Sequence, residues 1–232
     1  MSDAQFLEQF DPPAYKIASF EIAHYELIEY VARQKKPIII STGIANLDEI
    51  RAVVDLCKEC ANEDIVLLQC ASSYPAPASS VHLANMADMK ERFGVMVGFS
   101  DHTLGVEASM LATALGACVI EKHFILDKSI NSADAHFSLD EAEFAHLAQK
   151  IADARELVGE VSYGAHARSR DFARSIYALK DIAKGEVFSH ENIGVIRPSF
   201  GLHPRYFKEL LGNKSNNSLK KGQRLTMDFL KD

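Results

Sequence analysis

The sequence contains no tryptophan and only four cysteines among its 232 residues. So few cysteines in a chain of this size suggest a reducing compartment. Cys57 and Cys60 have the CxxC spacing of a redox or zinc motif. They lie within a helical pattern, however, without a second CxxC or CxxH and without a Trp-Cys-Gly context, so the pattern favours two plain helix cysteines.

An excess of basic residues is also missing. The chain has 25 Lys and Arg against 32 Asp and Glu, which gives a formal net charge of -7. A general nucleic-acid-binding protein would carry a basic surface, so this composition argues against that class. It is compatible with an anionic small-molecule substrate, because a local cluster of Lys, Arg and His can exist in an acidic protein.

Long apolar runs are absent as well. No stretch approaches the roughly 18 to 20 uninterrupted apolar residues that span a bilayer. The first residues, Met1 to Gln5, have neither the basic nor the apolar region of a signal peptide. Hydrophobic residues make up 47% of the chain and charged residues 25%, enough for a sizeable core. We therefore expect a globular cytoplasmic protein.

Short β-branched runs alternate with helical patterns over the first 160 residues or so. The strand candidates are continuous apolar runs, as in parallel strands that are covered on both faces: Tyr15–Ala18, Pro37–Ser41, Ile65–Cys70, Val95–Phe99 and Cys118–Lys122. Helices are expected at about Ile22–Gln34, Leu47–Cys60, Val81–Arg92, Val106–Leu115 and Asp140–Val158. Five consecutive βα units indicate an α/β fold, either a (β/α)8 barrel or an open doubly wound sheet.

Local signals support two of these helix boundaries. Asn46 with Glu49 three residues later predicts an N-cap and a capping box for the second helix, and Gly159 ends the last one. Asp3 to Phe10 have the pattern of the tail of a helix. Because five strands cannot close an eight-stranded barrel, we expect part of the barrel to be missing upstream of Met1.

The character of the sequence changes after Gly159. Residues 160–171 are polar and mixed and are predicted to be a linker between a partial barrel, residues 1–159, and a small domain, residues 172–232. That domain contains an internal repeat, because residues 181–193 match residues 218–230 around Lys-Gly turns at Gly185 and Gly222. The segment after each turn is predicted to be a strand that runs into a short helical turn. A pseudo-symmetric β domain is expected.

Four motifs follow predicted strands at their carboxyl ends, where parallel α/β barrels place their active sites. They are Tyr15-Lys16-Ile17-Ala18-Ser19, Ile40-Ser41-Thr42-Gly43, Gly98-Phe99-Ser100-Asp101-His102-Thr103 and Ile120-Glu121-Lys122-His123-Phe124. With the segment from Gln69 to Pro75 they resemble strands four to eight of the (β/α)8 TIM barrel of the sialic acid synthase family. The repeat domain resembles the antifreeze-like (SAF, β-clip) domain of that family. The segments 172–178 and 197–204 are most similar to the branch that makes pseudaminic acid.

The resemblance implies an enzyme that condenses phosphoenolpyruvate with an acetamido sugar. In this branch the sugar would be 2,4-diacetamido-2,4,6-trideoxy-L-altrose, and the products would be pseudaminic acid and phosphate. A divalent metal ion, usually Mn²⁺, would hold the aldehyde oxygen of the sugar. Synthesis of N-acetylneuraminate or legionaminate is the alternative chemistry, and an inactive truncated remnant is the alternative from another class.

The site residues are carried over from the family by their positions in the motifs. His102 and His123 end neighbouring strands, which lie about 4.8 Å apart, so their imidazoles can share one metal ion. The phosphoenolpyruvate shell comprises one cation and four hydroxyls, a chemically sensible set for a trianion: Lys16, Ser19, Ser41, Ser72 and Ser100. Ser72 stands where sialic acid synthases usually carry Asn.

Three further residues match family positions near the sugar. Glu121 and Asp134 are the candidate catalytic carboxylates, although Glu121 could instead pair with its neighbour Lys122. Arg197 matches an arginine that reaches the acetamido sugar of the other subunit in a homodimer with exchanged domains. Its alternative interpretation is a surface arginine before a proline turn.

A glutamate, a lysine and a threonine on the first three strands of the family barrel have no counterpart in this sequence. Loss of one acid–base group typically costs about 10² to 10⁴ in rate. We therefore expect the 232-residue chain by itself to lack synthase activity and to fold poorly.

Overall fold

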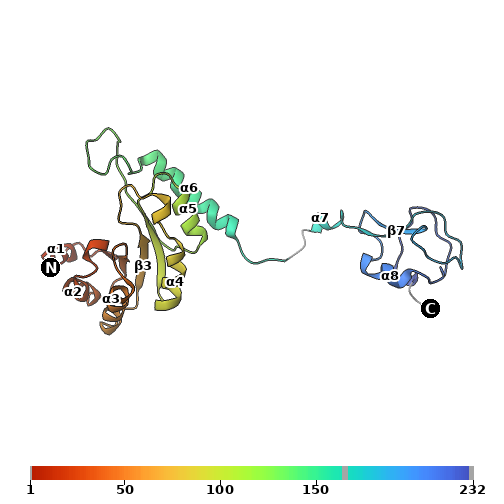
Figure 1. The fold of residues 1–232 in the computed structure, drawn as a ribbon, viewed down its shortest axis with the longest axis horizontal. Helices are drawn as coiled ribbons and strands as arrows, with labels where there is room; N and C mark the ends of the chain where they lie inside the picture. The colour runs from red at the N-terminus through yellow and green to blue at the C-terminus, as the bar shows by residue number, and fades with distance from the viewer. Residues whose placement is uncertain (1, 164–166, 230–232) are drawn as a thin grey trace. The chain divides into compact units, whose positions relative to one another are not determined.

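The computed structural model describes residues 2–163 and 167–229. The chain divides into two compact units, Met1–Glu160 and Val161–Asp232, here called the first and the second unit (Figure 1). The part of the predicted linker at residues 164–166 lies outside the described residues, and Ala167–Arg170 form a short helix, α7. No helix among the described residues is long and apolar enough to cross a membrane.

The first unit is built on one sheet of five parallel strands in the order β1-β2-β3-β4-β5. The strands are β1 (Tyr15–Ile17), β2 (Ile38–Ser41), β3 (Ile65–Cys70), β4 (Met96–Asp101) and β5 (Ile120–Lys122). All four ladders are parallel, with consecutive strands as neighbours. This topology confirms the predicted partial barrel and rules out the doubly wound alternative, in which the strand order would reverse.

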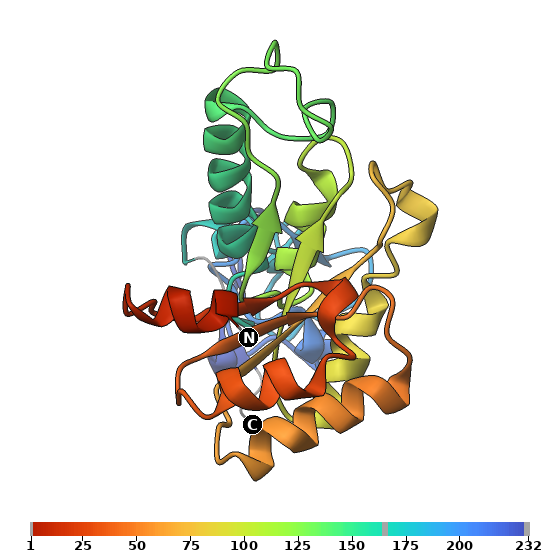
Figure 2. The same ribbon diagram turned by 90° about the vertical axis from the view of Figure 1, so that its left-hand side faces the viewer.

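One helix precedes the first strand, and the others connect the strands or follow the last of them. They are α1 (Ser2–Glu8), α2 (Tyr25–Ala32), α3 (Leu47–Glu59), α4 (Ala84–Phe93), α5 (Glu107–Ala114) and α6 (Glu141–Val158). Figure 2 shows α2 and α3 side by side along the sheet, and α6 packs beside α5. The capping box of α3 is confirmed, because Asn46 Oδ1 accepts from the backbone N–H of Glu49 and the Glu49 side chain accepts from that of Asn46.

Several predicted boundaries were wrong by two or three residues, including the start of α4, which lies at Ala84 instead of Val81. Helix α2 begins at Tyr25 instead of Ile22, because Ser19–Glu21 form a separate 3-10 turn, η1. Strand β4 continues two residues beyond Phe99, since Ser100 and Asp101 pair with β5 despite being polar. Strand β5 begins at Ile120 instead of Cys118, because the pairing with β4 begins at Ile120.

The two faces of the sheet carry different residues. Alternate residues of β1 to β4 join the core with the helices, and these residues are Tyr15, Ile17, Ile38, Ile40, Ile65, Leu67, Val97 and Phe99. On β5, Ile120 packs against this core. Side chains alternate between the faces of a strand, so Lys16, Ser41, Ser100 and Glu121 lie on the opposite face, here called the inner face. Burial against the helices thereby determines which residues can form a site.

The second unit contains a two-stranded antiparallel sheet, β6 (Ser175–Ala178) with β7 (Ile193–Ile196), and short helical segments. These segments are η3 (Pro204–Tyr206), α8 (Phe207–Leu210) and η4 (Met227–Phe229). The two copies of the repeat pair with each other, because Ile182 and Leu219 exchange backbone hydrogen bonds. Gly185 and Gly222 both have positive φ, of 86° and 80°, which explains the glycine in each turn.

The strands predicted after the Lys-Gly turns were wrong. The segments form single bridges, Val187 with Lys214 and Arg224 with Tyr177, instead of extended ladders. The helical turn predicted in the second copy is present as η4, up to Phe229, and the last residue of that copy, Leu230, lies outside the described residues. A core of apolar side chains holds the unit together, with Ile176, Phe188 and Leu225 each at most 1% exposed.

The structure predicts how the four thiols react. Cys57, Cys60 and Cys70 are buried and Cys118 is exposed. Burial raises the pKa of Cys57 to about 11, so its thiol stays protonated and unreactive at neutral pH. We expect Ellman's reagent to modify one thiol rapidly in the native chain and the other three only after denaturation. Cys118→Ser should abolish the rapid phase, and a second rapid thiol in the native chain would contradict the described packing.

Candidate functional site

The carboxyl ends of the five strands place polar side chains together on the inner face. Lys16 Nζ of β1 donates a hydrogen bond of 2.8 Å to Ser41 Oγ of β2 and lies 3.6 Å from Glu121 Oε2 of β5. Ser100 Oγ of β4 donates to the other oxygen of Glu121 at 2.7 Å. Four of the predicted residues therefore form one connected cluster.

The contact between Lys16 and Glu121 also measures the curvature of the sheet. These residues lie on β1 and β5, the two edge strands of the order β1 to β5. In a flat sheet, four strand spacings of about 4.8 Å would separate them by about 19 Å. Their charged atoms are 3.6 Å apart, so the sheet curves around the inner face as a barrel wall does.

The two remaining serines of the predicted set meet beside this cluster. Ser19 Oγ lies 3.3 Å from Ser72 Oγ and accepts a hydrogen bond from the backbone N–H of Ile44. Gly43 leaves space for them, because a Cβ there would come within 2.4 Å of Ser72 Oγ and 2.5 Å of Cys70 Sγ. Burial raises the pKa of Cys70. The thiol therefore keeps its proton and is only a weak donor, so the hydroxyls are the stronger donors to an anion here.

The two predicted metal ligands are neighbours. The rings of His102 and His123 are 5.2 Å apart between centroids, in an edge-to-face arrangement. His102 Nδ1 lies 3.0 Å from the carbonyl oxygen of Ala71, and since a carbonyl can only accept, Nδ1 carries the proton. Burial lowers the pKa of His102, so the ring is neutral at neutral pH and its Nε2 lone pair is available.

This donor set is suitable for a divalent metal ion. A ligating imidazole usually donates its other N–H to a carbonyl or a carboxylate, as His102 does to Ala71. His123 Nδ1 lies 3.5 Å from Asp134 Oδ2, so Asp134 is the acidic group beside the second ring. Within the described ranges no group of three or more His, Cys, Asp or Glu is arranged to hold a metal. The two imidazoles would therefore need water or substrate oxygens as further ligands.

Two aromatic residues enclose the histidines, and both were missed in the sequence. The Tyr74 ring centroid is 4.3 Å from that of His102, and the Phe137 centroid is 4.8 Å from that of His123. Tyr74 was present in the motif after β3, but Phe137 comes from the long loop before α6, where Asp134 was the only predicted site residue. Burial raises the pKa of Tyr74, so its hydroxyl remains a donor at neutral pH.

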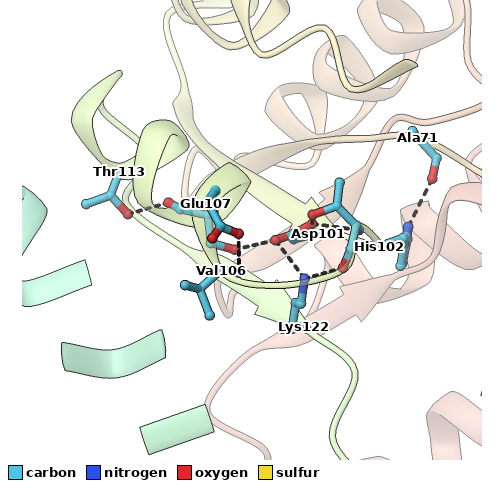
Figure 3. A network of polar contacts seen from close by, with 9 residues as sticks. Ala71, Asp101, His102, Val106, Glu107, Thr113 and Lys122 are labelled. Carbon is cyan, nitrogen blue, oxygen red and sulfur yellow. Dashed lines mark hydrogen bonds and ion pairs between the residues drawn. The ribbon is translucent and has the colours of Figure 1, made fainter. Parts of the chain in front are cut away.

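The alternative pairing of Glu121 with Lys122 does not occur. Lys122 turns to the helix side of the sheet and forms a buried ion pair with Asp101, also missed in the sequence (Figure 3). Breaking such a pair by removing one partner typically costs about 3 to 5 kcal/mol.

Arg197 belongs to the second unit, where its side chain is exposed.

The curved parallel sheet with its site at the carboxyl ends, followed by a small β unit, defines a barrel-type enzyme scaffold with an appended module. Residues 1–163 match the NeuB family and residues 173–231 match the SAF domain. The chain therefore belongs to the NeuB family. This assignment confirms the resemblance to sialic acid synthases that the strand-end motifs predicted.

Individual relatives agree with this assignment. The chain is 47% identical over 226 residues to a pseudaminic acid synthase of Campylobacter jejuni, covering 96% of this chain and 66% of that protein. It is 43% identical over 228 residues to a pseudaminic acid synthase of Helicobacter pylori, covering 97% and 67%. The solved structure of a spore coat polysaccharide biosynthesis protein of Bacillus subtilis matches with a TM-score of 0.65 and 33% identity, covering 100% of this chain and 72% of that one. The chain thus spans about two thirds of the length of these sequence relatives.

Proposed function

We propose that the protein is a pseudaminic acid synthase, which condenses phosphoenolpyruvate with 2,4-diacetamido-2,4,6-trideoxy-L-altrose. The observation that carries the proposal is the identity of 43 to 47% with proteins of that name along almost the whole chain. The inner face supports it, because a cation, several hydroxyls and two imidazoles lie together there. The proposed reaction needs each of these groups.

Phosphoenolpyruvate would bind at the end of the inner face that carries Lys16. Its phosphate and carboxylate are anionic, and Lys16 with Ser41 supplies a charged and a neutral donor 2.8 Å apart. Ser19, Ser72 and Ser100 supply further hydroxyls. The hydrogens of Ser19 and Ser72 can rotate towards an anion, because the two hydroxyls hydrogen-bond mainly to each other and to the backbone.

The sugar would bind beside the two histidines. His102 and His123 would hold a divalent ion, for which we propose Mn²⁺. When bound, the metal would supply Lewis-acid polarisation of the sugar carbonyl. Tyr74 and Phe137 pack against the two rings. Phosphoenolpyruvate and sugar would then meet between the Lys16 cluster and the histidines.

The overall reaction balances with water as the only further reactant. A bond forms between C3 of phosphoenolpyruvate and the aldehyde carbon of the sugar. Water adds its oxygen at C2, the bond between C2 and the phosphate oxygen breaks, and inorganic phosphate leaves. Glu121, held by Ser100 and Lys16, is positioned to orient the water or a sugar hydroxyl and to accept a proton. Asp134, which lies beside His123, would bind or orient the sugar.

Product analysis tests the choice of sugar. The purified whole protein would be incubated with phosphoenolpyruvate, Mn²⁺ and each candidate acetamido sugar, and phosphate release and product mass would be measured. We expect kcat/KM for the altrose derivative to exceed that for the other sugars by about 100-fold or more, because unpaired polar groups in a hydrogen-bonding site penalise the wrong substrate. Preference for the precursor of legionaminate or N-acetylneuraminate would show that the protein makes that product instead of pseudaminic acid. Absence of any condensation would indicate a non-catalytic remnant.

Substitution of the histidines tests the metal site. His102→Ala and His123→Ala should each lower Mn²⁺-dependent condensation by at least about 100-fold, because a Lewis-acid metal contributes several kcal/mol to the transition state. His146→Ala, on the exposed side of α6, is the matched control and should leave the rate unchanged. Circular dichroism would check the fold of each variant. Undiminished metal binding by the double variant would exclude this site.

Arg197 tests the proposed homodimer. In the whole protein, Arg197→Ala should raise the KM for the sugar by about tenfold, because its guanidinium would donate to the acetamido carbonyl or to sugar hydroxyls. Binding of phosphoenolpyruvate and of metal should not change. Arg205→Ala, another exposed arginine of the second unit, is the control.

A mixing experiment decides which subunit Arg197 serves. The predicted linker of about a dozen residues reaches at most ~40 Å when extended, enough to carry the second unit to a neighbouring subunit. Mixed dimers of Arg197→Ala and His102→Ala chains would then contain one intact site and regain part of the activity. No recovery despite demonstrated subunit exchange would mean that Arg197 acts within its own chain or not at all.

A further inference from the structure

A buried ion pair lies behind the two histidines, on the helix side of the sheet. Asp101 Oδ2 and Lys122 Nζ are 2.9 Å apart, and their side chains are 0% and 1% exposed. Asp101 and Lys122 are register partners on β4 and β5. Each directly precedes one of the histidines in the sequence, His102 and His123 respectively. The ion pair and the imidazole pair are therefore adjacent residue pairs at the carboxyl ends of β4 and β5. Because side chains alternate along a strand, the two pairs lie on opposite faces of the sheet.

The carboxylate of Asp101 has a full set of donors. Its Oδ1 accepts from the backbone N–H of Thr103 at 2.8 Å and from Thr103 Oγ1 at 2.7 Å, and its Oδ2 accepts from Ser109 Oγ at 2.6 Å. Lys122 Nζ also donates to the carbonyl oxygen of Thr103 at 2.6 Å. These hydrogen bonds join Asp101 and Lys122 to Thr103 and so hold the backbone on both sides of His102 (Figure 3).

The loop after β3 holds the same turn from the other side. The carbonyl oxygen of His102 accepts from the backbone N–H of Ala76 at 2.9 Å, and its ring is bonded to the carbonyl of Ala71. On the neighbouring strand, the carbonyl oxygen of His123 accepts from the backbone N–H of Leu139 at 2.9 Å. The ring positions thus depend on where the two backbone segments lie relative to each other.

Strand β5 has few other contacts that fix that relation, chiefly its short backbone ladder with β4 and the hydrogen bond from Ser100 to Glu121. It has only three residues, Ile120–Lys122, each partly exposed as a whole residue although the side chain of Lys122 is buried, and within the described residues it is an edge strand. A shift of one residue along β4 would move every side chain of β5 to the opposite face. Such a shift would take His123 away from His102 and would leave Asp101 buried without its cation. The ion pair therefore selects the one register in which both imidazoles lie on the inner face.

We propose that Asp101 and Lys122 are a positioning pair, which sets the register of β5 on β4 and thereby the separation and orientation of His102 and His123. Neither side chain reaches the inner face, so neither contacts substrate. The geometric part of this proposal is independent of the reaction. Only its consequence for metal affinity and turnover rests on the proposed function.

The decisive variant is Lys122→Met, which removes the charge and keeps most of the length of the side chain. Asp101 retains three donors in this variant, so the chain is expected to fold. In metal-free whole protein, the imidazole nitrogen signals of His102 and His123 should shift in NMR spectra, including loss of the hydrogen-bonded Nδ1–H of His102. Mn²⁺ affinity, measured by calorimetry, should fall by about 10- to 100-fold, the usual range for residues that support ligands.

Two comparisons separate positioning from general destabilisation. Lys128→Met breaks a half-exposed ion pair with Glu143 and should change neither the imidazole signals nor the Mn²⁺ affinity. Lys122→Arg keeps the charge and should restore most of the affinity lost in Lys122→Met. In kinetics, Lys122→Met should lower kcat with little change in the KM for phosphoenolpyruvate, because Lys16 and Ser41 lie on β1 and β2, whose positions do not depend on the register of β5.

A milder variant covers the case in which Lys122→Met does not fold. Thr103→Val removes only the hydroxyl bond to Asp101 and should shift the His102 signal in the same direction by a smaller amount. Imidazole signals and Mn²⁺ affinity that stay unchanged in folded Lys122→Met, or in Thr103→Val if Lys122→Met does not fold, would overturn the proposal. The NMR comparison needs no catalysis, so it decides the positioning role even if the proposed reaction fails its own test.

Discussion

The parallel pairing of five short strands is the constraint on which the rest of the first unit depends. Because consecutive strands are neighbours and run in the same direction, all five carboxyl ends meet at one edge of the sheet. Residues far apart in the sequence, such as Lys16 and Glu121, become contacts through this arrangement alone.

The two faces of the sheet have different roles, because one packs against the helices and the other carries the polar site residues. One face supplies apolar residues to the helices, and its burial provides the main stabilising free energy of the unit. The other face curves enough to bring its edge strands within ion-pair distance, and this curvature concentrates Lys16, the serines and the histidines in a small space. The same alternation that builds the core therefore also builds the site.

The charged side chains at the strand ends are paired with groups of opposite charge, and the buried ones also have hydrogen-bond partners. A buried charge is costly unless it is paired and hydrogen-bonded, and Asp101 and Lys122 satisfy both conditions on the helix side. On the inner face Lys16 and Glu121 are partly exposed, which leaves them able to exchange partners when an anion binds. A buried, fully bonded pair thus lies behind a partly exposed pair.

The sequence by itself determined the βα succession, the α3 cap, the family and nearly all site candidates, because these follow from local hydrophobic patterns and short motifs at strand ends. Only the tertiary structure decided which side chains contact each other in the site. Glu121 pairs with Lys16 and not with Lys122, and Phe137 folds back from the loop after β5 onto the ring of His123. The polar end of β4 went unrecognised, and the strands predicted in the repeats were wrong, because hydrogen bonding to neighbouring segments, and not local residue preference, decides where a strand forms. Such pairings depend on sheet curvature and register, which arise from packing between segments far apart in the chain.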